Sequence, residues 1–83
     1  MKMLNENDVL STQDMSLTAT LCYFNYKIVG VDRREDSSKV YFLIEREKGL
    51  DETIQAFWSH TLKVEPLAYF NCLKEVKTRL YNT

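Results

Sequence analysis

The only histidine of the chain, His60, follows an aromatic pair in the segment Phe57-Trp58-Ser59-His60. An aromatic pair stacks well on a base or on a peptide, and an imidazole is the commonest general base. A catalytic His60 needs a nucleophile and an orienting carboxylate, which no motif of this sequence supplies. The alternative, which we expect, is that the two rings anchor a helix and that His60 ends it.

The thiols and carboxylates do not form a pattern typical of a metal or catalytic site. Cys22 and Cys72 lie in separate apolar stretches, so with one histidine there are too few ligands for zinc and too few cysteines for a disulfide framework. We expect free thiols in a reducing cytoplasm, with a disulfide bridge as the less favoured alternative. Asp51-Glu52 suits the start of a helix better than a metal. We therefore predict no enzyme, no metal and no cofactor.

Basic residues gather near a predicted turn and in the C-terminal stretch, where they could contact phosphates. Nearby acidic residues and a formal net charge of −1 favour ordinary surface charge instead. Nucleic-acid binding is therefore the alternative function. Its candidate residues are Arg33, Arg34, Lys74, Lys77 and Arg79.

Eighty-three residues make one domain, which we place at residues 9–83 after a flexible N-terminal lead over 1–8. Residues 9–12 are expected to form a short edge strand. Asp14 or Ser16 is a suitable N-cap for a helix over 15–24, whose apolar residues recur at helical spacing. Asn25 then favours the left-handed conformation that ends helices.

Two β-branched stretches predict a hairpin over 27–34 and 39–45, with a turn at 35–38. In the first strand, Val29 and Val31 are expected to share one face and Ile28 the other, while Gly30 indicates a bulge. The second strand is apolar on both faces, so it is either central or in contact with another subunit on the face of Tyr41 and Leu43.

Gly49 marks a break before a predicted helix over 51–60, and Pro66 suits the first turn of a helix over 66–81. Leu67 and Phe70 are expected to widen the buried face of the last helix. The predicted fold class is α+β: a short helix, an antiparallel β-hairpin that becomes three-stranded if the N-terminal segment joins it, and two helices packed on one face of the sheet.

From residue 10 to residue 80 the sequence resembles an uncharacterised family of small domains found in bacteria, archaea and their viruses. The resemblance rests on QDMSLTATL, KVYFLIE, LDETI, AFWSHTLKVEP and LAYFNCLKEVKTRL. The family favours glycine after the first helix, where this chain has Asn25. The resemblance implies the α+β fold and a viral or mobile-element origin, but no mechanism.

Five tyrosines exceed what so small a core readily covers, and tyrosine is well suited to interfaces. We therefore predict a non-enzymatic binding module that acts through protein–protein contact with a host protein, or with a second copy as a homodimer. The candidate interaction residues are Tyr41, Leu43, Trp58 and His60. No signal peptide or membrane-spanning stretch is recognisable, so we expect the cytoplasm, or the host cytoplasm for a viral protein, and no membrane partner.

Overall fold

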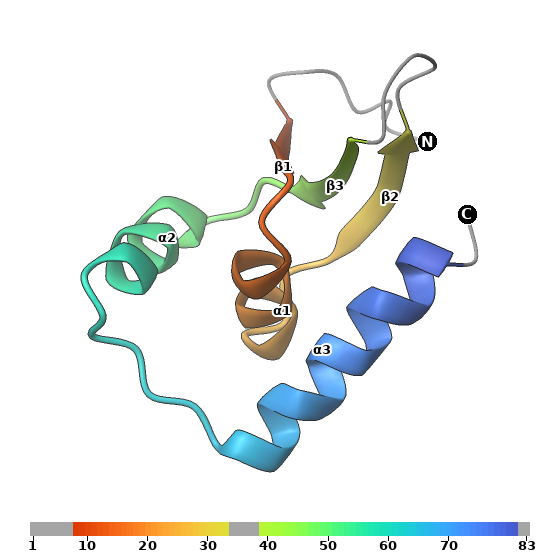
Figure 1. Ribbon diagram of the computed structural model, residues 1–83. Coiled ribbons are helices and arrows are strands. Elements are labelled where there is room, and N and C mark those ends of the chain that lie inside the picture. The colour runs from red at the N-terminus through yellow and green to blue at the C-terminus, as the bar shows by residue number, and fades with distance from the viewer. Residues whose placement is uncertain (1–7, 34–38, 82–83) are drawn as a thin grey trace.

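The computed structural model describes residues 8–33 and 39–81, and these residues form three strands and three helices (Figure 1). The predicted α+β fold is confirmed, and the N-terminal segment supplies the third strand. The predicted turn at 35–38, Arg34 and residues 1–7 of the predicted lead lie outside the described residues. The elements are, in order, β1 (Val9–Thr12), α1 (Met15–Tyr23), β2 (Ile28–Arg33), β3 (Val40–Glu45), α2 (Leu50–Trp58) and α3 (Pro66–Tyr81).

The sheet is antiparallel, with the strand order β1-β3-β2, so β3 is central as its two apolar faces predicted. Val9 pairs with Glu45 and Thr12 with Phe42. Residue 8 continues this pairing, because the backbone N–H of Arg46 donates to its carbonyl at 2.8 Å. The predicted edge strand over residues 9–12 is therefore confirmed as β1, which lies at one edge of the sheet, with β2 at the other.

A β-bulge changes the faces of β2. Ile28 pairs with Ile44 and Gly30 pairs with Leu43. Ile44 and Leu43 are adjacent in β3, so Val29 is an extra residue in β2 that has no partner in β3. Ile28 and Val31 consequently both face the core, and Val29 is 42% exposed. The bulge expected near Gly30 is present, but the prediction that Val29 and Val31 share a face is wrong, because the extra residue shifts the alternation by one.

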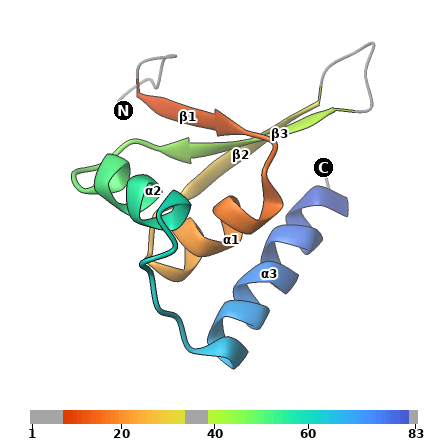
Figure 2. The ribbon, with the colours of Figure 1, turned by 60° about the vertical axis from the view of Figure 1, so that its left-hand side comes forward.

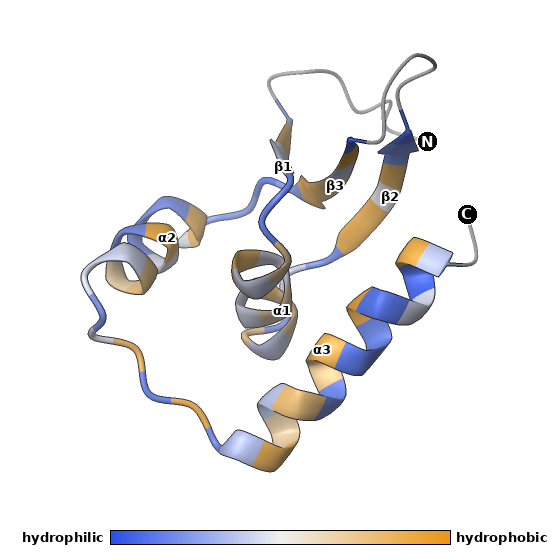
Figure 3. Cartoon of the chain, viewed as in Figure 1, coloured by the Kyte–Doolittle hydropathy of each residue, from blue (hydrophilic) through white to orange (hydrophobic). Residues whose placement is uncertain are grey.

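The helices of the described chain all lie on one side of the sheet, with α1 between α2 and α3 (Figures 1 and 2). Much of β2 and β3 is made of hydrophobic residues, whereas α3 carries alternating hydrophobic and hydrophilic bands (Figure 3). The sheet contributes Ile28, Phe42 and Ile44 to the core, and the helices contribute Leu17, Ala19, Leu21, Leu50 and Val76. The other face of the sheet has no helix over it in the described part of the chain.

Short polar contacts hold the helix ends in place. The Asp14 carboxylate accepts the backbone N–H of Leu17 at 3.0 Å, which confirms Asp14 as the N-cap of α1. The Glu65 carboxylate accepts the N–H groups of Leu67 and Ala68 at the start of α3, at 3.2 and 2.6 Å. Predicted and observed helix bounds agree for α3, and they differ by one or two residues at the ends of α1 and α2.

Candidate functional site

Tyr41 and Leu43 lie on the face of β3 that points away from the helices, as predicted. Both side chains are half-buried. The Tyr41 hydroxyl accepts a hydrogen bond from the Gln13 amide at 3.3 Å, and Leu43 covers the backbone of Gly30, with its Cδ1 3.6 Å from where a Cβ would stand. This face of the sheet is therefore partly closed by its own side chains.

Trp58 and His60 lie at the C-terminal end of α2, on the helical side of the molecule. Phe57 packs against the core, but Trp58, which we expected to anchor the helix with it, is 59% exposed and meets the Phe57 ring edge-on at 4.9 Å. The four residues predicted to share one interaction surface are thus divided between two sides of the molecule. The helix α2 lies on the helical side of the sheet, whereas Tyr41 and Leu43 lie on the opposite face of β3.

His60 has a backbone role. It adopts a left-handed φ of 60°, and its N–H donates to Phe57 while that of Thr61 donates to Ala56, the pairing of a Schellman motif. Its side chain is exposed, and within residues 8–33 and 39–81 no hydroxyl, thiol or carboxylate is hydrogen-bonded to its imidazole. A catalytic arrangement around His60 is therefore not formed by the described residues.

The basic residues considered for phosphate contact have different surroundings. Arg79 donates to the Ile28 carbonyl at 3.2 Å, and Arg33 donates to the Leu80 carbonyl at the end of α3, so both link β2 to α3. Lys74 lies over the Phe70 ring, with its ammonium 5.0 Å from the centroid, and Lys77 is exposed. Arg34 lies outside the described residues. Of the described members, Arg33 and Arg79 thus bond to backbone carbonyls of the fold, whereas Lys74 and Lys77 are exposed on α3.

An exposed face of α3 was missed from the sequence. Leu67 and Phe70, expected to be buried, are 66% and 50% exposed, and Tyr81 is 78% exposed. Leu67 stands nine positions before the fully buried Val76, which puts it on the opposite side of a helix with 3.6 residues per turn. This angular separation between Leu67 and Val76 is the signal in the sequence that could have predicted the exposure of Leu67. We call this surface the outer face of α3: Leu67, Phe70, Lys74, Lys77 and Tyr81.

The inner side of α3 is joined to α1 by polar contacts. The Tyr23 hydroxyl accepts the Glu65 backbone N–H at 3.0 Å, and the Cys22 thiol donates to the Glu75 carboxylate at 3.3 Å. Burial, Glu75 and the neighbouring Cys72 raise the pKa of the Cys22 thiol from 9.0 to about 12. Cys22 is therefore protonated at neutral pH, which does not suit it to act alone as a nucleophile.

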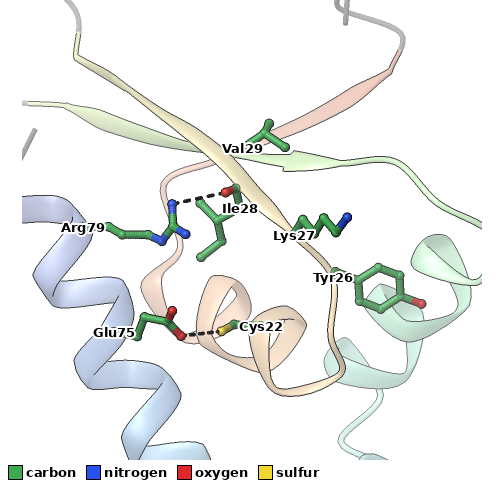
Figure 4. A pocket seen from close by; sticks show the side chains of 7 residues that line it. All are labelled: Cys22, Tyr26, Lys27, Ile28, Val29, Glu75 and Arg79. Carbon is green, nitrogen blue, oxygen red and sulfur yellow. Dashed lines mark hydrogen bonds between the residues drawn. The ribbon is translucent and has the colours of Figure 1, made fainter. Parts of the chain in front are cut away.

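A pocket of about 330 Å³ opens beside these groups, between the end of α1, the start of β2 and α3 (Figure 4). Arg79 and Glu75 project into it from α3, and Ile28 lines it from β2. The pocket residues are Cys22, Tyr26, Lys27, Ile28, Val29, Glu75 and Arg79. Among the residues that the structure describes, no group of three His, Cys, Asp or Glu side chains is placed to bind a metal ion.

No helix within the described ranges is both long and apolar enough to cross a membrane. Comparison with curated proteins and with solved structures gave no significant match. The family model described as a domain of unknown function, DUF5659, matches residues 7–82, which is nearly the whole chain and includes every helix and strand above. The expected resemblance to an uncharacterised family of small domains is thereby confirmed, and the chain belongs to the DUF5659 family.

Proposed function

We propose that the protein is a non-enzymatic, intracellular binding module that acts through protein–protein contact along the outer face of α3. The observation that carries this proposal is the exposure of Leu67, Phe70 and Tyr81 on one side of a single helix. At about 1.5 Å per residue the stripe from Leu67 to Tyr81 is about 21 Å long. Exposed apolar side chains grouped in this way are typical of interaction sites. The viral or mobile-element origin, with a host protein as partner, is part of the same proposal.

Charge favours an acidic, amphipathic helix as the occupant of this face. Lys74 and Lys77 stand at its middle, with apolar residues toward both ends, and the face contains no acidic residue. A partner helix with carboxylates between two apolar ends matches this order, as in helix-in-groove recognition. A second copy fits less well: antiparallel pairing of two such helices would put Lys74 opposite Lys74, and like charges there repel.

The test first captures a partner from the native cell, identifies it and purifies it. The affinity of this partner is then measured for variants in the outer face of α3 and for variants elsewhere on the molecule. Phe70→Ser and the charge reversal Lys74→Glu with Lys77→Glu are expected to weaken its binding at least about tenfold, as for interface hot spots. Leu43→Ser, on the outer face of the sheet, and Trp58→Ser, at the end of α2, serve as matched controls. Loss of binding in these controls alone would instead support the predicted surface of Tyr41, Leu43, Trp58 and His60.

Nucleic-acid binding is the second candidate, because Phe70 and Tyr81 place aromatic rings beside two lysines. Arg33 and Arg79 contribute less to it, since both donate to backbone carbonyls of the fold. A titration with single-stranded and duplex oligonucleotides at low and moderate salt separates the two classes. Binding at low salt that Lys74→Ala and Lys77→Ala abolish would favour this candidate, and its absence at low salt would eliminate it.

A further inference from the structure

Small residues on α1 allow α3 to pack closely against it. Ser16, Ala19 and Cys22 follow one another at three-residue intervals along α1, and each is small. Ala19 is fully buried, and the Tyr69 hydroxyl of α3 reaches the Ser16 carbonyl at 3.4 Å. The distance between packed helices depends on the side chains at the contact, so small residues along α1 allow α3 to approach.

The two cysteines meet at this interface. The Cys22 thiol hydrogen-bonds to Glu75 at 3.3 Å, and burial, Glu75 and the neighbouring Cys72 raise the pKa of Cys22. Cys72 and Glu75 are three residues apart, so they occupy neighbouring positions on one side of α3. Both thiols are free and half-buried. Two groups far apart in the sequence are thus held together by helix packing.

The pocket beside Cys22 gives a small solute access to Cys22 and Glu75, which both line it (Figure 4). Its volume, about 330 Å³, is at the small end of the range of ligand pockets. Lys27 and Arg79 line it with positive charge and Glu75 with negative charge, so the net charge of its lining favours an anionic solute over a cationic one.

We propose that Cys22 and Cys72 are a modification site, at which a low-molecular-weight disulfide such as oxidised glutathione converts the two thiols into a disulfide that joins α1 to α3. One thiolate attacks the glutathione disulfide and forms a mixed disulfide, releasing one reduced glutathione. The second protein thiolate then displaces the other. Two protein thiols lose two electrons and two protons, and the broken S–S bond of the oxidant gains them as two thiols.

Oxidation would hold α3 against α1 covalently and thereby fix the helix that carries the exposed stripe. The surroundings of Cys22 affect the rate. Burial opposes its ionisation most, and Glu75 and Cys72 from α3 oppose it further, while Lys27 and Arg79 are the cations that line the same pocket. Because the protonated form of Cys22 predominates at neutral pH, the disulfide forms slowly there and faster as the pH rises.

The first experiment incubates the full chain in buffers of oxidised and reduced glutathione, alkylates the remaining thiols and measures intact mass and peptide maps. The expected product is a monomer that has lost two hydrogen atoms, with Cys22 linked to Cys72 and a higher melting temperature than the reduced protein. Cys22→Ser and Cys72→Ser should each give only a mixed glutathione adduct and no rise in melting temperature. Wild-type protein that yields only adducts or intermolecular dimers would overturn the proposal.

A second measurement separates folded geometry from chance encounter. The equilibrium constant for the Cys22–Cys72 linkage should be at least about a hundredfold larger in the folded protein than in denaturant, because folding raises the effective concentration of one thiol near the other. Glu75→Gln should accelerate linkage several-fold at neutral pH, since it removes the carboxylate that opposes ionisation of Cys22. Equal constants with and without denaturant would show that the structure does not position the pair.

Discussion

Asn25 and His60 occupy the same position in the same motif, one residue beyond the C-cap of α1 and of α2. Their φ angles are 72° and 60°, and in each case two backbone N–H groups close the helix: Asn25 and Tyr26 donate to Cys22 and Leu21, and His60 and Thr61 donate to Phe57 and Ala56. Asparagine and histidine are both enriched among the non-glycine residues that adopt the left-handed region, but only glycine adopts it without a clash from Cβ. His60 therefore ends α2 at some cost to stability.

Replacing His60 with glycine should stabilise the protein. His60→Gly relieves the left-handed strain and is expected to raise the free energy of unfolding by about 0.5–1.5 kcal/mol, while Asn25→Gly raises it by less. Urea denaturation followed by circular dichroism measures both. His60→Ala is the matched control, because alanine keeps the strain, and its unfolding free energy should stay near that of the wild type. A destabilised His60→Gly variant would show that the imidazole makes a contact of value.

Gly49→Ala should destabilise the protein by about 1–2 kcal/mol. Gly49 has a φ of 90°, and an added Cβ would stand 3.0 Å from the Tyr26 hydroxyl, which is itself 3.2 Å from the Thr53 hydroxyl. Gly30→Ala is the control, since its Cβ would meet Leu43 at an ordinary 3.6 Å. In a Tyr26→Phe background part of the Gly49→Ala loss should disappear and the part due to φ should remain. Equal losses at the two glycines would contradict this account.

Arg79→Ala should lower the free energy of unfolding by about 1–2 kcal/mol, because it removes a partly buried, charge-assisted hydrogen bond to the Ile28 carbonyl. Lys77→Ala, on the exposed side of the same helix, should change it by no more than about 0.5 kcal/mol. Thermal and urea unfolding of both variants compare them directly. A stability loss in Lys77→Ala equal to that in Arg79→Ala would mean that the two cations have similar structural roles.

Stability should fall with rising pH above the ordinary ionisation range of a thiol. In the folded protein the pKa of Cys22 is about 12, against 9.0 for the unfolded chain, so the folded state holds this proton more tightly. The stabilising contribution is complete below pH 9 and is lost as the pH rises toward 12. Cys22→Ser isolates it from tyrosine and lysine titration. The stability difference between wild type and Cys22→Ser should therefore shift against the wild type above pH 9, and a pH-independent difference would contradict the prediction.

Much of the fold was predictable from the sequence because its signals are local. Asp14 and Pro66 mark helix starts through their own backbone chemistry, and Asn25 marks a helix end in the same way. The apolar residues on both faces of residues 39–45 predicted a central strand, and β3 is central, although no helix of the described chain covers its second face. The bounds of α3 followed from Pro66 and an apolar repeat.

Only the tertiary structure decided which of these apolar residues are covered and which distant residues meet. One extra residue in β2 placed Val29 and Val31, which were expected to share a face, on different faces, and the packing of α3 on α1 left Leu67 and Phe70 exposed. The same packing placed Cys22 beside Cys72 and Glu75, and it engaged Arg33 and Arg79 with backbone carbonyls. Caps, turns and periodicity act over a few residues, so a sequence can determine them alone. Exposure and side-chain pairing between separate elements depend on how those elements pack.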